Sequence, residues 1–300
     1  MSSISEATTK FALDFFKVLN KDHPSDNIIY SPLSISAALG MVLLGARGNT
    51  ATQIQKVAPH LHFIHTVPDD QCDIPGGIHS QFHDIFSAIN KPTTSYELAN
   101  ANRLYGEKTF NFLQTTSKPV QMMYHKGEYK IATIEEHHSQ VLELPYKGGD
   151  LSMYILLPKD NMGLTQLEKE LTYEKLTTWI SPDHLKEDEV DVALPRFKVE
   201  TSAQLKQYLE ALGMTDVFHP GASDLSGMAK EGGLFVSEAV HKAYIEVNEE
   251  GTVAAAATGI GIHTISLRIP VQFVADHPFL FFIRHQKTKC ILFYGRVSSP

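Results

Sequence analysis

Histidines are the first residues of this sequence whose chemistry attracts attention, because the chain holds 15 of them. The closest cluster is His60, His62 and His65, and the pair His137–His138 comes next. Imidazoles bind transition metals, but neither cluster has the spacing of a zinc enzyme or an accompanying carboxylate or cysteine pattern. We interpret both as loop histidines, and the sequence predicts neither a metal site nor a cofactor.

Catalytic side chains form no known motif either. The chain contains no Gly-x-Ser-x-Gly turn, no Gly-x-Gly-x-x-Gly fingerprint and no P-loop. Serine, histidine and aspartate all occur, as in any chain of 300 residues, and their presence alone does not predict a catalytic triad. We therefore expect that this protein is not an enzyme.

The segment 249–269, EEGTVAAAATGIGIHTISLRI, combines small residues with spaced β-branched ones. From Gly251 through Leu267 it has neither a charged side chain nor a proline, so it is suited to join an open sheet edge. The alternative is a helix, which the run of four alanines favours. Gly259 and Gly261 would each cost a helix about 1 kcal/mol. The segment is ambivalent between helix and strand, as a loop with two conformations needs to be.

Composition limits the classes of partner. The formal net charge of −8 argues against nucleic acid and anionic membranes as main partners. The N-terminal sequence is not a signal peptide, and no apolar run reaches transmembrane length. The two cysteines, Cys72 and Cys290, show no metal or redox spacing. We expect a cytoplasmic protein, with release that needs no signal peptide as the alternative.

The elements that position these residues indicate a mixed α+β fold with large sheets. No linker divides the chain, so we expect one domain over residues 1–300. We predict helices at 33–44, 164–170 and 173–179 and strands at 98–105, 141–144, 151–157, 190–194, 234–247, 279–283 and 290–294. Residues 120–134 read as a hairpin that turns at Lys126–Gly127.

Several of these stretches resemble the serpin family, in its intracellular, ovalbumin-like branch. The blocks that carry the resemblance are NIIYSPLSIS (27–36), ANANRLYG (99–106), LPRF (194–197), VHKAYIEVNEEGT (240–252), FVADHPFLFFI (273–283) and GRVSSP (295–300). The resemblance extends over nearly the whole chain. It implies a serpin fold, in which a large sheet A stands beside sheets B and C and surrounding helices.

The resemblance also implies a mechanism, in which a serine protease cleaves an exposed reactive-centre loop, here residues 248–270. The start of the loop then inserts into sheet A as an extra strand and distorts the attached protease. Insertion needs small hinge residues, because every other side chain must enter a packed interior. The implied hinge consists of Glu249, Glu250, Gly251, Thr252, Val253, Ala254, Ala255, Ala256, Ala257 and Thr258.

Counting by the family's spacing places the cleaved bond between Ile265 and Ser266, which favours an elastase- or chymotrypsin-like protease. The alternative is Arg268, which suits a trypsin-like enzyme, and Leu267 lies between the two candidates. The resemblance further implies that Ser31, Ser34 and His241 occupy the shutter, the region beneath sheet A that opens during insertion.

The chain departs from the family pattern at about 113–119, where relatives carry a long additional segment. The family's helix F, its strand 3A and the shutter asparagine that would partner His241 belong to that segment. Without strand 3A, an inserted hinge would gain hydrogen bonds on one side only. Two functions stay open: a monomeric inhibitor that risks forming loop–sheet polymers, or a non-inhibitory binding protein. A splice isoform and a gene-model error remain as explanations of the gap.

Overall fold

An eight-stranded sheet is the larger of two sheets in the computed structural model, which describes residues 3–58, 84, 87–88, 120–160, 163–228, 233–248 and 270–299. Its strands follow in the order β1 (Ile28–Tyr30), β10 (Ile291–Val297), β9 (Phe279–His285), β4 (Leu151–Pro158), β3 (Ser139–Pro145), β2 (Met122–Ile134), β5 (Lys186–Pro195) and β8 (Val271–Val274). Neighbours are antiparallel except β5 and β8, which are parallel. The central strand β4 is buried at every position, which explains its continuous apolar sequence.

A second, two-stranded sheet pairs β6 (Phe197–Gln204) with β7 (Val240–Val247) in antiparallel register. Its strand β7 begins the VHKAYIEVNEEGT block, which leads into the implied reactive-centre loop. Along β7 the side chains alternate, so that His241, Ala243, Ile245 and Val247 are buried and the residues between them are exposed. Within the described ranges β7 is paired with β6 alone.

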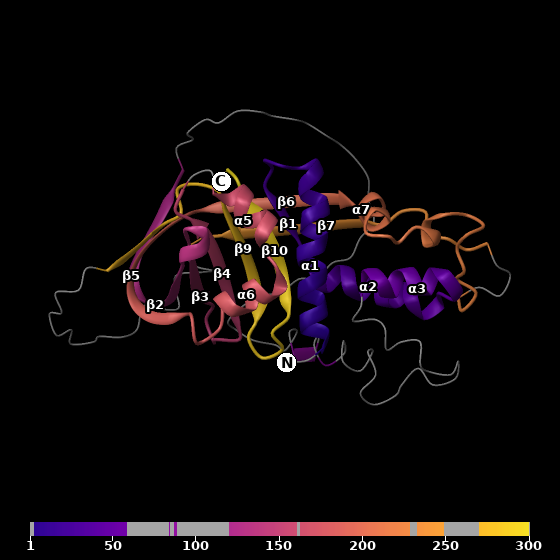
Figure 1. The fold of residues 1–300 in the computed structure, drawn as a ribbon, viewed down its shortest axis with the longest axis horizontal. Coiled ribbons are helices and arrows are strands. Elements are labelled where there is room, and N and C mark those ends of the chain that lie inside the picture. Colours follow the sequence, from indigo (N-terminus) through magenta and orange to yellow (C-terminus); the bar gives the residue numbers. More distant parts are fainter. Residues whose placement is uncertain are drawn as a thin grey trace.

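The helices lie over the strands or at their ends, and some extend well beyond the sheets on one side (Figure 1). They are α1 (Ser3–Asp22), α2 (Pro32–Gly45), α3 (Gly48–Val57), α5 (Leu164–Glu170), α6 (Tyr173–Trp179) and α7 (Leu205–Ala211), with short 3-10 turns η2 (Glu135–His137) and η3 (Asp216–Phe218). The longest described helix, α1, contacts α2, α6, α7 and β10, and α7 in turn contacts β7 of the second sheet. Its buried face brings Phe15 to Tyr30 and Phe16 to Tyr294, with ring centroids 5.1 and 5.2 Å apart.

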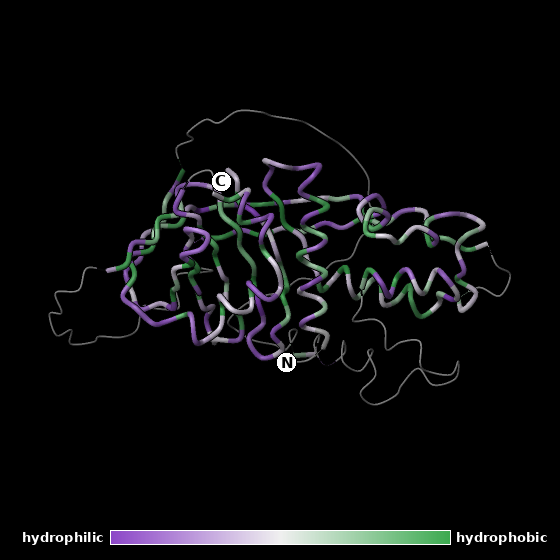
Figure 2. The backbone as a smooth tube through the Cα atoms, viewed as in Figure 1, coloured by the Kyte–Doolittle hydropathy of each residue, from purple (hydrophilic) through white to green (hydrophobic). Residues whose placement is uncertain are grey.

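Hydropathy follows this arrangement. In Figure 2 the apolar colour concentrates on the inner strands and on α2. The sequence of α2 is apolar nearly all round, although Met41 and Leu44 are exposed on the described surface. No helix in the described ranges is both long and apolar enough to cross a membrane.

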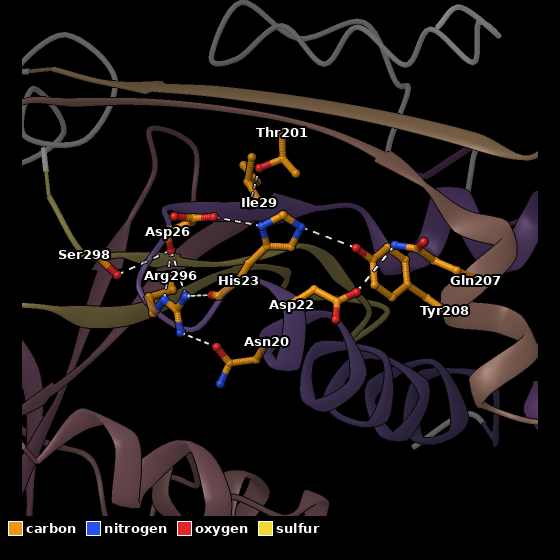
Figure 3. Close-up of polar contacts among 10 residues, drawn as sticks. All are labelled: Asn20, Asp22, His23, Asp26, Ile29, Thr201, Gln207, Tyr208, Arg296 and Ser298. Atoms are coloured by element: carbon orange, nitrogen blue, oxygen red, sulfur yellow. Dashed lines mark hydrogen bonds and ion pairs between the residues drawn. The ribbon is translucent and has the colours of Figure 1, made fainter. Parts of the chain in front are cut away.

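A buried arginine fastens the last strand to the rest of the fold (Figure 3). Arg296 is 1% exposed, and its Nη1 donates to Asn20 Oδ1 at 2.5 Å and to Glu168 Oε1 at 3.0 Å. Its Nη2 donates to the carbonyl of Asp26 at 2.8 Å and to that of His23. These bonds tie β10 to the end of α1 and to α5. The guanidinium is therefore satisfied by partners from two separate parts of the chain, residues 20–26 and Glu168.

Most predicted elements are confirmed, and one is wrong. The helices at 164–170 and 173–179 and the strands near 141–144, 151–157, 279–283 and 290–294 are present, whereas the strand predicted at 234–247 begins only at Val240. The strand predicted at 98–105 lies outside the described residues.

The hairpin predicted at Lys126–Gly127 does not form, because β2 continues through it. Lys126 and Gly127 pair with Asp191 and Val190 of β5 in an unbroken register. Gly127 has another role: a Cβ atom there would lie 3.1 Å from the His125 ring and 3.3 Å from the Tyr129 ring. The Tyr129 hydroxyl and His125 Nδ1 are 2.7 Å apart. Glycine at this position makes room for the contact instead of forming a turn.

Candidate functional site

The three predicted shutter residues meet where β7 passes the start of α2. Ser31, Ser34 and His241 are all buried, and we call them the shutter residues. The Ser31 backbone N–H donates to His241 Nε2 at 2.9 Å, although the two residues are 210 positions apart in the sequence. The structure therefore brings Ser31 and His241 into direct contact.

His241 is held in its neutral form by its surroundings. Its position on β7 places it opposite Ala203 of β6, on the inward face. Burial penalises the imidazolium and lowers the pKa of His241 to about 4. Since Nε2 accepts the Ser31 hydrogen bond, a neutral ring carries its proton on Nδ1. The contact between β7 and α2 thus requires an unprotonated histidine.

Ser31 connects this histidine to the helix. It is the N-cap of α2, and its Oγ accepts from the Ser34 N–H at 3.3 Å while its carbonyl accepts from Ile35 N at 3.1 Å. Pro32 follows at the first helical position, where a missing N–H has no cost. One residue therefore caps α2 and also fixes it against β7.

Replacing Ser31 by alanine is expected to lower the free energy of unfolding by about 1 kcal/mol, because the cap acceptor is lost. Replacing it by threonine retains a hydroxyl and should recover most of this loss. Urea denaturation followed by circular dichroism measures both. Equal stability of the alanine variant and the natural chain would show that the Ser31 hydroxyl does not cap α2.

The predicted loop lies outside the described residues, but its two flanking strands do not. Residues 249–269, which include the hinge and the Ile265–Ser266 bond with its alternatives Leu267 and Arg268, follow Val247, the last residue of β7. The next strand, β8, begins at Val271, which pairs with Val190 of β5. The segment is therefore bounded by strands of two different sheets.

The histidine clusters show no metal geometry where they can be described. His60, His62 and His65 lie outside the described residues. The His137 ring contacts Lys175 Nζ at 2.9 Å, Glu170 Oε2 at 3.4 Å and the Trp179 ring. An ammonium beside the imidazole is a hydrogen-bond partner and not a co-ligand. Within the described ranges, no three histidine, cysteine, aspartate or glutamate side chains group as metal ligands do.

Sequence reasoning overlooked two basic residues in apolar strands, the half-buried Arg284 and the buried Arg296. Each interrupts a strand that is otherwise strongly apolar, FLFFIRH and ILFYGRV. A lone charge in such a strand is a usable signal, since buried charges are retained only with partners or for a function. Arg296 has the partners described above.

Comparison with known proteins gives consistent matches. The sequence profile of a family described as serpin (serine protease inhibitor) matches residues 6–115 and 107–300. The human leukocyte elastase inhibitor is 39% identical over 392 aligned residues, and human Serpin B11 is 39% identical over 395. Both alignments cover 100% of this chain and 100% of the relative. The structure of uncleaved ovalbumin matches with a TM-score of 0.82 at 31% identity and 100% coverage of both chains.

These alignments are longer than the chain itself. They extend over 392 and 395 positions, whereas the chain has 300 residues. A substantial stretch of each relative therefore has no counterpart in this sequence.

Proposed function

This chain belongs to the serpin family, and from that membership we propose that it is a serine protease inhibitor which acts as a suicide substrate. The observation that carries the proposal is the composition of the hinge, where Gly251 to Thr258 are all small or β-branched. A strand of such residues enters a packed sheet without burying a charge or displacing large side chains. On this proposal, the protein binds no cofactor and catalyses no reaction.

The position of the hinge supports this proposal. It follows directly on β7, whose described pairing is with β6 on one side only. A hinge that folds back would lie beside β7 and extend the two-stranded sheet. His241 belongs to β7 and accepts from Ser31 at the start of α2, so a strand that enters beside β7 would act on this contact.

We propose Ile265–Ser266 as the cleaved bond and a protease with an apolar primary pocket, elastase- or chymotrypsin-like, as the partner. Leu267 and Arg268 are the alternatives, and Arg268 would indicate a trypsin-like enzyme. The inhibitor acts as a monomer in the cytoplasm, and exposed sheet edges give it a tendency to polymerise. Release without a signal peptide would extend its targets to secreted proteases.

The decisive test is a protease titration read on a denaturing gel. Incubation with elastase or chymotrypsin is expected to give a denaturant-resistant complex, and sequencing of the released C-terminal fragment identifies the bond. A fragment that begins at Ser266 supports the proposed bond. Complete cleavage without any complex would contradict the inhibitory mechanism.

Two neighbouring variants make this test specific for insertion. Successive residues of a strand point to opposite faces, so only one of the changes Ala254→Arg and Ala255→Arg brings its charge into the interior. We expect one variant to be cleaved without forming a complex and the other to retain the complex. Equal behaviour of the two would show that complex formation does not depend on a strand inserted at this position.

The second candidate function is a non-inhibitory serpin-fold binding protein. Three observations favour it. The family profile matches in two segments that overlap at 107–115, and the chain is shorter than its relatives. In addition, β7 has one described partner strand. We propose an internal deletion at about 113–119 that removes helix F and strand 3A from a single domain. Inserted residues would then lack hydrogen bonds along one edge.

Thermal denaturation before and after loop cleavage separates the two functions. Insertion adds a strand and should raise the melting temperature strongly, whereas a binding protein without insertion should show little change. Sequencing of the transcript decides between a splice isoform and a gene-model error.

A further inference from the structure

Side chains close the edge of the eight-stranded sheet at β1. Among the described strands, β1 is the last one on this side of the sheet, and β10 is its neighbour within the sheet. Backbone N–H groups of an antiparallel strand point alternately toward the paired strand and away from it. Ile29 N donates to Thr201 Oγ1 at 3.0 Å, and Ser31 N donates to His241 Nε2 at 2.9 Å (the first contact is drawn in Figure 3). Since Ile29 and Ser31 are two positions apart, their N–H groups point to the same side, away from β10.

Both acceptors belong to the two-stranded sheet. Thr201 lies on β6 and His241 on β7, and both strands contact β1. The other inward positions of β6 are apolar and buried: Phe197, Val199 and Ala203. A polar side chain among such neighbours indicates a specific hydrogen-bond partner. The position of Thr201 in this apolar series is therefore explained by its contact with β1.

The surroundings of Ile29 make an acceptor necessary. All three residues of β1 are buried, and Ile29 is 0% exposed. A buried N–H group without an acceptor has a free-energy cost similar to that of a lost hydrogen bond. An edge whose N–H groups are unpaired is also a template for pairing with another chain. The Thr201 hydroxyl supplies the acceptor that a further strand would otherwise provide.

We propose that Thr201 is a latch, which together with His241 holds the two-stranded sheet against β1 and closes this edge of the eight-stranded sheet. The two contacts lie on one edge and lead to one sheet. They should therefore open together when the two-stranded sheet moves away from β1 as a unit. The latch acts in the uncleaved chain and does not depend on protease inhibition.

Amide hydrogen exchange of the full, uncleaved chain, read by NMR at single residues, tests the latch. Thr201→Val retains the shape of the side chain but removes the acceptor. We expect exchange at both Ile29 and Ser31 to become at least tenfold faster, because the edge opens more often. The amide of Tyr294 in β10 should change less than twofold, since the ladder between β10 and its neighbours stays closed. Thr201→Ser retains a hydroxyl and should keep all three exchange rates within threefold.

Ser202→Val is the matched control, because Ser202 is the next residue of β6 and is exposed. It should change exchange less than twofold at the three amides. Faster exchange at Ile29 alone in the Thr201→Val variant would show that Thr201 caps one amide without holding the sheet. Equal acceleration at Ile29, Ser31 and Tyr294 would show a general loss of stability instead of an opened edge. Unchanged exchange would show that the hydroxyl is not needed, and each of these three results overturns the proposal.

Discussion

Replacement of Arg296 by methionine is expected to lower the free energy of unfolding by about 3–5 kcal/mol. The arginine is buried and forms an ion pair with Glu168 at 3.0 Å, and it donates to Asn20 and to two backbone carbonyls. Without it, Glu168 keeps the Asn20 amide at 2.9 Å but loses its cation. An unpaired buried carboxylate is the main reason for the loss.

A double variant separates the cost of the unpaired charge from the value of the pair. Removing both partners, as in Arg296→Met with Glu168→Leu, should recover most of the lost stability because no buried charge remains. Urea denaturation followed by circular dichroism gives all three free energies. Lys287→Met, which removes an exposed cation, is the control and should change stability by less than about 0.5 kcal/mol. A loss below about 1 kcal/mol in the Arg296 variant would contradict the predicted role of the ion pair.

Stability is expected to fall by about 3 kcal/mol between pH 6.5 and pH 4 because of His241 alone. The unfolded chain protonates this histidine near its ordinary pKa of 6.5, whereas burial lowers the pKa in the folded protein to about 4. Above pH 6.5 both states are neutral and the full stability is present. As the pH falls, the unfolded state binds the proton first, so stability decreases until the folded state is protonated too.

Measurement of the unfolding free energy from pH 7.5 to 4 tests this prediction. His241→Gln retains an acceptor for the Ser31 N–H but no titrating group, so its profile should be flatter by about the same 3 kcal/mol. His285, whose pKa is also lowered mainly by burial, contributes in the same direction and remains in both proteins. The difference between the two profiles therefore isolates His241. Parallel profiles would show that His241 does not control the acid sensitivity.

Local sequence was informative where one element is recognisable by its own pattern. Four elements lie close to their predicted positions: the helices at 164–170 and 173–179 and the last two strands. Their apolar residues recur with the spacing that brings them into the core, so the sequence pattern alone locates them. The helix predicted at 33–44 is also present, as α2 from Pro32 to Gly45.

Local sequence misled where a distant partner decides the conformation. Lys126–Gly127 is a good turn by composition, yet β5 pairs with it on one side and holds β2 extended. Long-range pairing of this kind outweighs local turn preference, because an interrupted ladder would leave backbone groups without partners. Gly127 nevertheless has a structural reason, because the side chains of His125 and Tyr129 approach each other closely beside it.

The sequence by itself determined the family, and it predicted the small-residue hinge and the shutter residues, since these are properties of residue types in a fixed order. Only the tertiary structure decided that His241 accepts from Ser31 with a strongly lowered pKa. It alone showed that Arg296 finds its partners on α1 and α5. The physical reason is that burial and hydrogen-bond partners belong to pairs of residues distant in sequence, which no local pattern records.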